Sequence, residues 1–122
     1  MTIQELVEII KENFGDENKV IDISDMDFGD YTVRISGLKT EKNLFQHYQK
    51  VGGMLSQSHQ KVGLNLFQNH QEVGSSIYQD KQEAGRVIYQ EYQKAKDNIY
   101  QGHSTAGDTI YQFDQKAKEI IN

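Results

Sequence analysis

A unit of eleven residues repeats without interruption from position 45 to position 121. The triplet Ile-Tyr-Gln, for example, returns at Ile77, Ile88 and Ile99. Seven copies fill this stretch and leave only Asn122. Position 1 of the repeat is aromatic in six copies, position 2 is always Gln, position 5 is Gln in six copies, position 7 is Val or Ala, position 8 is Gly or Lys, and position 11 is Leu or Ile. A repeat this regular decides most of the fold prediction.

Eleven residues correspond to three turns of an α-helix at about 3.67 residues per turn, so each repeat position keeps a nearly constant place around the helix. Positions 7, 11, 4, 8 and 1 then lie side by side as an apolar stripe, and polar residues occupy the other positions. The chain contains no Pro that would interrupt such a helix. The repeat therefore predicts one long amphipathic helix over residues 45–122, roughly 115 Å long at ~1.5 Å per residue.

The apolar stripe of so long a helix needs another surface to cover it, because the helix cannot cover itself. Positions 4, 7 and 11 follow the 3-4-4 spacing of hendecad coiled coils, which predicts a straight or slightly right-handed bundle or filament. The residues expected to carry this self-association are Phe45, Val51, Leu55, Val62, Leu66, Phe67, Val73, Ile77, Tyr78, Ile88, Tyr89, Ile99, Tyr100, Ile110, Tyr111 and Ile121.

Position 8 supplies glycines that cost a helix about 1 kcal/mol each relative to Ala. We interpret them as close-approach sites for a neighbouring backbone; inheritance from a duplicated unit is the alternative. These glycines are Gly52, Gly63, Gly74, Gly85 and Gly107. The invariant Gln of position 2 also has two interpretations. It forms a polar lateral contact between helices, since an amide both donates and accepts hydrogen bonds, or it reflects recent duplication.

The segment KVGLNLFQNHQEVG, residues 61–74, resembles the 11-residue repeats of synucleins. The whole repeat is similar to those of synucleins, perilipins, exchangeable apolipoproteins and late-embryogenesis-abundant proteins, and to hendecad coiled coils. This resemblance implies either reversible binding to a lipid surface or association of helices. Lipid-binding versions flank the apolar face with many lysines, whereas residues 45–122 hold eight basic and eight acidic side chains. Self-association is therefore the first expectation, and a membrane surface is the second.

Residues 1–44 differ from the repeat and are expected to form a small α-β-β head. Thr2 and Glu5 match a capping box, and Leu6, Ile9, Ile10 and Phe14 follow at helical spacing up to Gly15, which predicts a helix over residues 3–14. Residues 19–25 and 30–36 are rich in β-formers around a short turn and predict a β-hairpin. The predicted fold is mostly α, with this α+β head (residues 1–44) followed by the long helix (residues 45–122).

The order helix, strand, strand, helix and the segment YTVRISGLKTEKNLFQHYQKVGGML, residues 31–55, faintly resemble the BolA family. His47 and Val51 match the helix of that family loosely, whereas the Phe-x-Gly before the helix and the third strand are missing. The resemblance implies an iron–sulfur-trafficking module for the head.

Charge and composition exclude several functions. Residues 1–44 carry five basic and ten acidic side chains, and the whole chain has a formal net charge of -5, so we expect no nucleic-acid partner. The absence of Cys excludes thiolate chemistry and disulfides. No signal peptide and no apolar run of about 18 residues is present, which favours a soluble, cytoplasmic protein.

Three groups of polar residues are candidates for chemical sites. Asp22, Asp25, Asp27 and Asp30 crowd one turn, but Gly29 breaks the order of an EF-hand loop, so a solvated acidic turn is expected. The histidines at position 4 of the repeat, His59, His70 and His103, are spaced too far apart along a helix for one metal ion within a chain. In a symmetric bundle each could form a ring across chains, as a metal site or a pH-sensitive layer, but the mixed residues at this position favour a partly hydrated seam. The Ser-x-x-Lys pattern at residues 58–61 lies inside a repeat without a pocket.

The function expected from these patterns is structural self-assembly, in which long repeat helices associate into a homo-oligomeric bundle, sheath or filament. The alternative is a peripheral protein that binds a membrane or lipid surface. A third possibility is an adaptor whose acidic head recruits an unidentified partner. We expect no enzymatic activity, no cofactor and no metal, because the polar candidates do not converge.

Overall fold

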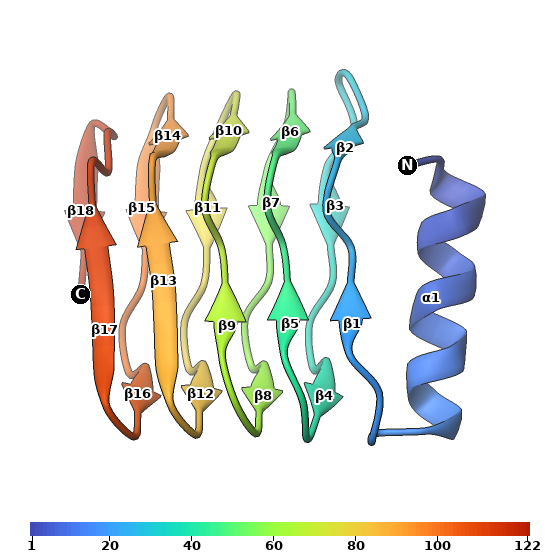
Figure 1. Ribbon diagram of the computed structural model, residues 1–122. Helices are drawn as coiled ribbons and strands as arrows, with labels where there is room; N and C mark the ends of the chain where they lie inside the picture. The colour runs from blue at the N-terminus through green and yellow to red at the C-terminus, as the bar shows by residue number, and fades with distance from the viewer.

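The computed structural model is a stack of flattened β-coils with a helix across one end (Figure 1). The structure describes residues 1–122 except for the side chains at positions 14 and 15. The chain begins with α1 (Ile3–Gly15) and then forms short strands that belong to four parallel sheets. We call these sheets A to D, in the order in which each coil visits them. This architecture is a parallel β-solenoid, in which every coil contacts only its neighbours.

Sheet A contains β1 (Ile21–Asp22), β5 (Leu44–Phe45), β9 (Leu66–Phe67), β13 (Val87–Glu91) and β17 (Thr109–Phe113). Sheet B contains β2 (Met26–Asp27), β6 (Gln49–Val51), β10 (Gln71–Val73) and β14 (Gln93–Ala95). Sheet C contains β3 (Val33–Arg34), β7 (Leu55–Ser56), β11 (Ile77–Tyr78), β15 (Asn98–Tyr100) and β18 (Glu119–Ile121). Sheet D contains β4 (Lys39–Thr40), β8 (Lys61–Val62), β12 (Glu83–Ala84) and β16 (Thr105–Ala106).

Two eleven-residue repeats make one coil. The register pairs Gln71 with Gln93 and Ile77 with Ile99, so residues 22 apart in sequence lie side by side. The first coil is one residue longer, since Ile21 pairs with Leu44. The last coil is one residue shorter on sheet C, where Ile99 pairs with Ile120. One eleven-residue repeat therefore forms half a turn of the solenoid.

Side chains alternate between the interior and the surface on both sides of repeat position 4. In β10, Gln71 and Val73 are buried and Glu72 is exposed. Around β11, Ile77 and Gln79 are buried, whereas Tyr78 between them is half-buried on the outside. Positions 11, 2, 5 and 7 of the repeat thus face inward and positions 1, 3 and 6 face outward, which is the period-two pattern of extended chain.

Position 4 turns the chain at the corner between two sheets. The residues there have left-handed backbone conformations, for example φ 57° at His70 and φ 54° at Lys81. Such a conformation costs an L-residue on the order of 1–2 kcal/mol, and His and Asp are among the residues that tolerate it best. The same conformation recurs at Asp25, Tyr48, His59, Tyr92, His103 and Asp114. A continuous helix is incompatible with these corners.

The prediction of one long hendecad helix over residues 45–122 was therefore wrong, together with the bundle, the filament of helices and the lipid-binding helix derived from it. The strands of all four sheets occupy that region. The resemblance to synuclein-like repeats and hendecad coiled coils fails for the same reason. Because a helix and half a solenoid turn both fit eleven residues, the repeat length alone does not distinguish them.

The β-hairpin predicted for the head is also absent from the part of the chain that the structure describes. Its strands are present as β1 and β3, but they pair in parallel with β5 and β7 of the next coil. The head is thus the first coil of the solenoid, which removes the basis of the BolA resemblance. The N-terminal helix is present as α1 with both hydrogen bonds of the capping box, whereas the predicted roles of Phe14 and Gly15 lie outside the described residues.

The hydrophobic core runs along the axis of the stack. It consists of inward-facing aliphatic residues from every sheet and of Leu6 from α1. The members with no measurable exposed surface are Ile23, Leu44, Leu66, Ile77, Ile88 and Ile99. Among the described residues, no helix combines the length and the apolarity needed to cross a membrane.

Candidate functional site

The interior contains columns of glutamine beside the aliphatic core. In sheet A, Gln68 Nε2 donates to Gln46 Oε1 at 2.9 Å and Gln90 Nε2 donates to Gln68 Oε1 at 3.1 Å. In sheet B, Gln71 and Gln93 each donate to the Gln of the preceding coil at 2.7 Å. An uncharged amide both donates and accepts, so it can repeat indefinitely along a stack. These columns bring together residues that the helical interpretation placed on the surface.

The glutamine columns end where the sequence changes to aliphatic residues. Gln46 and Gln60 each have a buried Nε2 atom without a hydrogen-bond partner. Lys61 pairs in register with Lys39, so the residue before it, Gln60, lies opposite Leu38 of the preceding coil. The aliphatic side chain of Leu38 offers no acceptor to the Gln60 amide. Both unpaired donors therefore mark the boundary between the first coil and the regular repeats.

The glycines predicted as close-approach sites lie where successive coils come nearest. A Cβ atom added at Gly85 would come within 3.0 Å of the carbonyl oxygen of Gly63. The same holds for Gly107 against Gly85 and for Gly74 against Gly52. The nearby backbone is the preceding coil of the same chain. The amide of Gly85 also donates to Val62 O at 2.9 Å, which holds the two coils at this spacing.

The residues predicted to carry self-association divide into three groups. Those from positions 7 and 11 of the repeat lie inside the solenoid: Val51, Leu55, Val62, Leu66, Val73, Ile77, Ile88 and Ile99. The aromatic residues of position 1 lie outside and stack on one another: Phe45, Phe67, Tyr78, Tyr89, Tyr100 and Tyr111. Ile110 and Ile121 belong to the last coil, where they are only half-buried.

The outer aromatic columns have ring spacings set by the strand spacing. The centroids of Phe45 and Phe67 are 4.8 Å apart, and those of Phe67 and Tyr89 are also 4.8 Å apart. His47 lies beside this column, with its ring centroid 5.4 Å from that of Phe67. Burial lowers the pKa of His47, and the nearby carboxylate of Asp22 partly opposes this effect. The neutral imidazole is therefore favoured at this position.

The corner residues of position 4 form two further columns on the surface. Tyr48, His70 and Tyr92 stack with centroid distances of 4.8 and 4.9 Å. His59, Lys81 and His103 occupy the opposite corners. No group of three or more potential ligands is arranged to hold a metal ion among the described residues, and this includes the acidic turn and the histidines.

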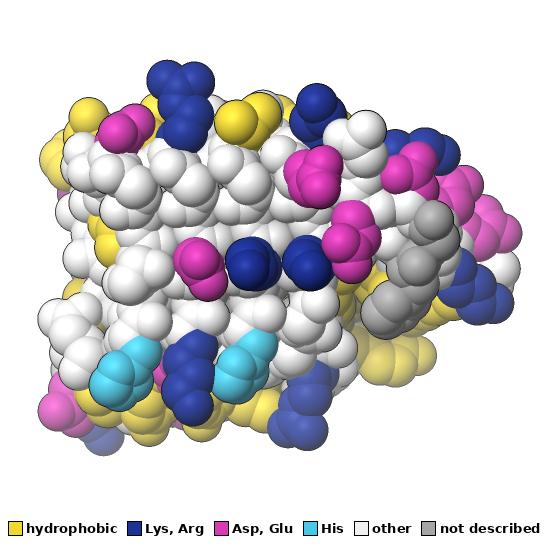
Figure 2. Space-filling model, turned by 90° about the horizontal axis from the view of Figure 1, so that it is seen from below, with side chains coloured by type: hydrophobic (Ala, Val, Ile, Leu, Met, Phe, Trp, Pro, Cys, Tyr) yellow, Lys and Arg dark blue, Asp and Glu magenta, His cyan; other side chains and the backbone are white. Residues whose placement is uncertain are grey.

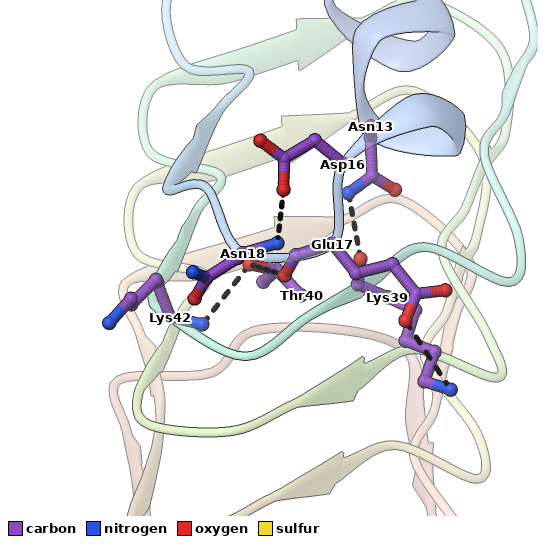
Figure 3. Close-up of polar contacts among 7 residues, drawn as sticks. All are labelled: Asn13, Asp16, Glu17, Asn18, Lys39, Thr40 and Lys42. Atoms are coloured by element: carbon purple, nitrogen blue, oxygen red, sulfur yellow. Dashed lines mark hydrogen bonds and ion pairs between the residues drawn. The ribbon is translucent and has the colours of Figure 1, made fainter.

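The N-terminal end of the stack is covered by α1. Asn13 Nδ2 donates to Lys39 O at 2.7 Å, and Thr40 Oγ1 lies 3.2 Å from Glu17 O (Figure 3). The carbonyl oxygen of Lys19 is a second acceptor for the Thr40 hydroxyl. At the other end of the helix, the terminal amino group of Met1 donates to Asp25 O at 2.8 Å.

A capping box formed by Thr2 and Glu5 closes the N-terminal end of α1. The backbone N–H of Thr2 donates to Glu5 Oε1, and this bond holds the pKa of the Glu5 carboxyl below its usual value. Together, α1 and the segment that joins it to β1 cover the edge that the first coil would otherwise expose.

The last coil is uncovered in the described structure. In earlier coils, the N–H groups of Leu44 and Gln46 donate to the next coil, to Asn65 O at 3.0 Å and Phe67 O at 2.7 Å. The equivalent residues of the last coil are Ile110 and Gln112, and they belong to β17, the terminal strand of sheet A. Ile110 and Gln112 occupy core positions of the repeat, yet Ile110 is only half-buried and Gln112 is exposed.

Apolar side chains surround this open end. Phe113 is 56% exposed and Tyr111 is 49% exposed. The ring of Phe113 packs edge-on against Tyr92 at 5.8 Å. In the equivalent outward positions of the preceding coils, the chain has His47, Asn69 and Glu91. The last coil is therefore more apolar on its outside than the coils that precede it.

Two grooves cross the coils over the rows of glycines. The groove over sheet B has a volume of about 440 Å³, and the one over sheet D has a volume of about 360 Å³. Figure 2 shows the face from below, where sheet D lies, with a row of basic and acidic side chains across it. In sheet D, the register aligns Lys39, Lys61 and Glu83 in successive coils.

The fold and these surfaces define a parallel β-solenoid with a helical cap at one end and an open coil at the other. Comparisons with protein-family models, with curated proteins and with solved structures give no match for this chain. The candidate site therefore depends on its own geometry.

Sequence reasoning missed the inward glutamines, although a signal for them was available. The segments on either side of position 4 alternate apolar or Gln residues with charged or aromatic ones, for example in Gln71-Glu72-Val73. Counting Gln as a core residue would have indicated extended chain with a period of two.

Proposed function

We propose that the protein is a structural assembly module that pairs with a second copy of itself through the open last coil. The observation that carries this proposal is the exposure of core positions at that end. Ile110 is half-buried and Gln112 is exposed, although the equivalent Ile88 and Gln90 are buried in the preceding coil. The role is structural and involves no catalysis.

Unpaired strand edges support this proposal. Strands β16, β17 and β18 are the terminal strands of sheets D, A and C. A terminal strand presents backbone N–H and C=O groups to any chain that can add to the sheet. Exposed apolar residues next to that edge, here Tyr111 and Phe113, add surface that a partner can bury.

The covered N-terminal end determines the kind of pairing. Because α1 covers the first coil, the N-terminal end of a second copy offers no free strand edge to the open end of the first copy. Two open ends can meet about a two-fold axis, which makes a closed dimer. In that arrangement β17 of each copy pairs antiparallel with β17 of the other, and the amide of Gln112, which already donates to Gln90 Oε1 at 3.0 Å, gains a second amide as partner.

Light scattering coupled to size exclusion tests this proposal. We expect a species of twice the 14.1 kDa chain mass that dissociates on dilution. Gln112→Lys places a charge on the open edge, so we expect it to give a monomer with an unchanged circular dichroism spectrum. Val7→Lys on the outer surface of α1 is the matched control and is expected to remain dimeric. A wild-type monomer at high concentration, or dissociation by Val7→Lys alone, would refute the proposal.

A further inference from the structure

Four lysines follow one another along the last two coils at and beside β14, the last strand of sheet B, which lies near the top of Figure 1. Lys94 and Lys116 are partners in a parallel β-bridge. The bridge is fixed by hydrogen bonds from Ala95 N to Lys116 O at 2.9 Å and from Lys116 N to Gln93 O at 2.8 Å. All four side chains of this cluster, Lys94, Lys96, Lys116 and Lys118, are exposed.

The backbone places Lys94 directly opposite Lys116, and Lys96 and Lys118 follow them in bends of the chain. Adjacent coils are about 4.8 Å apart. Lys118 N donates to Asp97 O at 2.6 Å, so Lys118 lies beside the residue that follows Lys96. Lysine side chains are long and flexible, so the ammonium groups of Lys94 and Lys116 and of the neighbouring Lys96 and Lys118 can reach one oxyanion.

The lysine cluster lacks ion-pair partners within the described chain. The ion pairs present among the described residues join Lys39 to Glu17 and Arg86 to Asp108. The nearby carboxylate of Asp97 accepts a hydrogen bond from Ser75 Oγ at 3.3 Å instead. Like charges placed directly opposite on neighbouring strands destabilise a sheet. An anion bound between the lysines would remove this repulsion.

The groove over sheet B leads to the lysine cluster. Its wall begins at Asp27 and Asp30, continues past Lys50 and Glu72, and ends at Lys94 and Lys96, with Gly52 and Gly74 also lining it. Glu72 is the register neighbour of Lys94, one coil away from the cluster. A long polyanion in this groove would meet the carboxylates of Glu72 and Asp27. A ligand with one anionic group and a neutral or cationic remainder avoids this repulsion.

We propose that the lysine cluster binds the oxyanion of a phosphate or sulfate monoester whose remainder is neutral or cationic and lies in the sheet B groove. Lysine ammonium groups donate charge-assisted hydrogen bonds to such an oxyanion. A cationic group one coil away, about 4.8 Å from the oxyanion, then lies beside the Glu72 carboxylate. The lysines lie at sheet B, whereas the proposed dimer uses the edge of β17 in sheet A, so the two proposals rest on different observations.

An NMR titration with O-phosphoethanolamine at constant ionic strength tests the site. We expect saturable shifts confined to the amides of residues 72, 94–97 and 116–118. The double variant Lys116→Gln and Lys118→Gln is expected to weaken binding at least about tenfold, because it removes two of the four charge-assisted donors. The control variant carries Lys42→Gln and Lys81→Gln, which removes two surface lysines elsewhere, and is expected to bind as the wild type does.

Comparison ligands define the chemical class. Tripolyphosphate is expected to bind less tightly than O-phosphoethanolamine, and ethanolamine is expected not to bind. Cosedimentation with vesicles that display the phosphoethanolamine headgroup would assign a lipid source, and binding of the free ester alone would assign a small molecule. The proposal is overturned if the shifts do not saturate, if they occur equally at all lysines, if tripolyphosphate binds more tightly, or if the double variant binds normally.

Discussion

Replacing Gly85 with Ala is expected to lower the free energy of unfolding by about 2–3 kcal/mol, the upper range for an overpacked interior. The added Cβ would lie within 3.0 Å of the Gly63 carbonyl oxygen. The neighbouring atoms are backbone, so the clash is relieved only by separating two coils. Chemical denaturation followed by circular dichroism measures the effect. Gly85 is the preferred site because Gly63, Gly85 and Gly107 occupy equivalent positions in three successive coils at sheet D. At sheet B, the equivalent positions of the last two coils are Lys96 and Lys118.

The sign of this effect distinguishes a solenoid from a helix. In a helix, Gly→Ala would raise stability by about 1 kcal/mol. The control is Gly102→Ala, because its added Cβ would meet the nearest backbone atom, the carbonyl carbon of Asn122, at 3.3 Å near the end of the chain. We expect a change of less than about 0.5 kcal/mol there. Stabilisation by Gly85→Ala would contradict the coil packing described above.

Replacing Gln71 with Glu is expected to cost roughly 3–5 kcal/mol at neutral pH, because it places an uncompensated charge in the interior. Gln71 is 1% exposed. Its Nε2 donates to Gln49 Oε1 at 2.7 Å, to Gln57 Oε1 at 3.2 Å and to Gln46 O at 3.2 Å. A carboxylate cannot donate to any of these oxygens and repels them.

The pH dependence of the Gln71→Glu variant follows from the same burial. Desolvation favours the neutral acid and raises the carboxyl pKa in the folded state above the unfolded value of about 4.3. The unfavourable contribution is therefore absent below about pH 4.3 and grows as the pH rises toward the folded-state pKa. Denaturation at several pH values measures it. Gln4→Glu on the exposed face of α1 is the control, and an equally small effect at both sites would contradict the buried glutamine network.

The periodicity of the chain was recognisable from sequence, but the structure that produces it was not. Eleven residues fit three helical turns as well as half a coil of 22 residues, so the choice depended on which side chains were assumed to be buried. Gln79 and Gln90 were assigned to the solvent face on the basis of polarity, whereas each pairs with an amide one coil away. A polar residue can be buried when an identical residue stacks on it, and that condition appears only in the assembled fold.

Local signals in the sequence were more reliable than the long-range ones. Thr2 and Glu5 predicted the start of α1, because a capping box depends only on neighbouring residues. The pairing of β1 with β5, by contrast, joins residues that are 23 positions apart. The corner conformation at Tyr48 and Lys81 was equally hidden, since neither residue type favours a positive φ. The candidate sites depend on these long-range pairings, so the sequence alone did not predict the open coil or the lysine cluster.

The coil register can be tested directly with a disulfide, because the chain contains no native Cys. Lys61 and Glu83 are register partners with exposed side chains. Neighbouring strands bring Cα atoms to about 4.8 Å, within the range of a disulfide. In a continuous helix the same residues would be about 33 Å apart. The double variant Lys61→Cys and Glu83→Cys is oxidised at high dilution and analysed by mass spectrometry, with Lys61→Cys and Glu72→Cys as the control pair. The solenoid predicts an intramolecular disulfide in the first variant and free thiols in the second, whereas free thiols in both variants would contradict it.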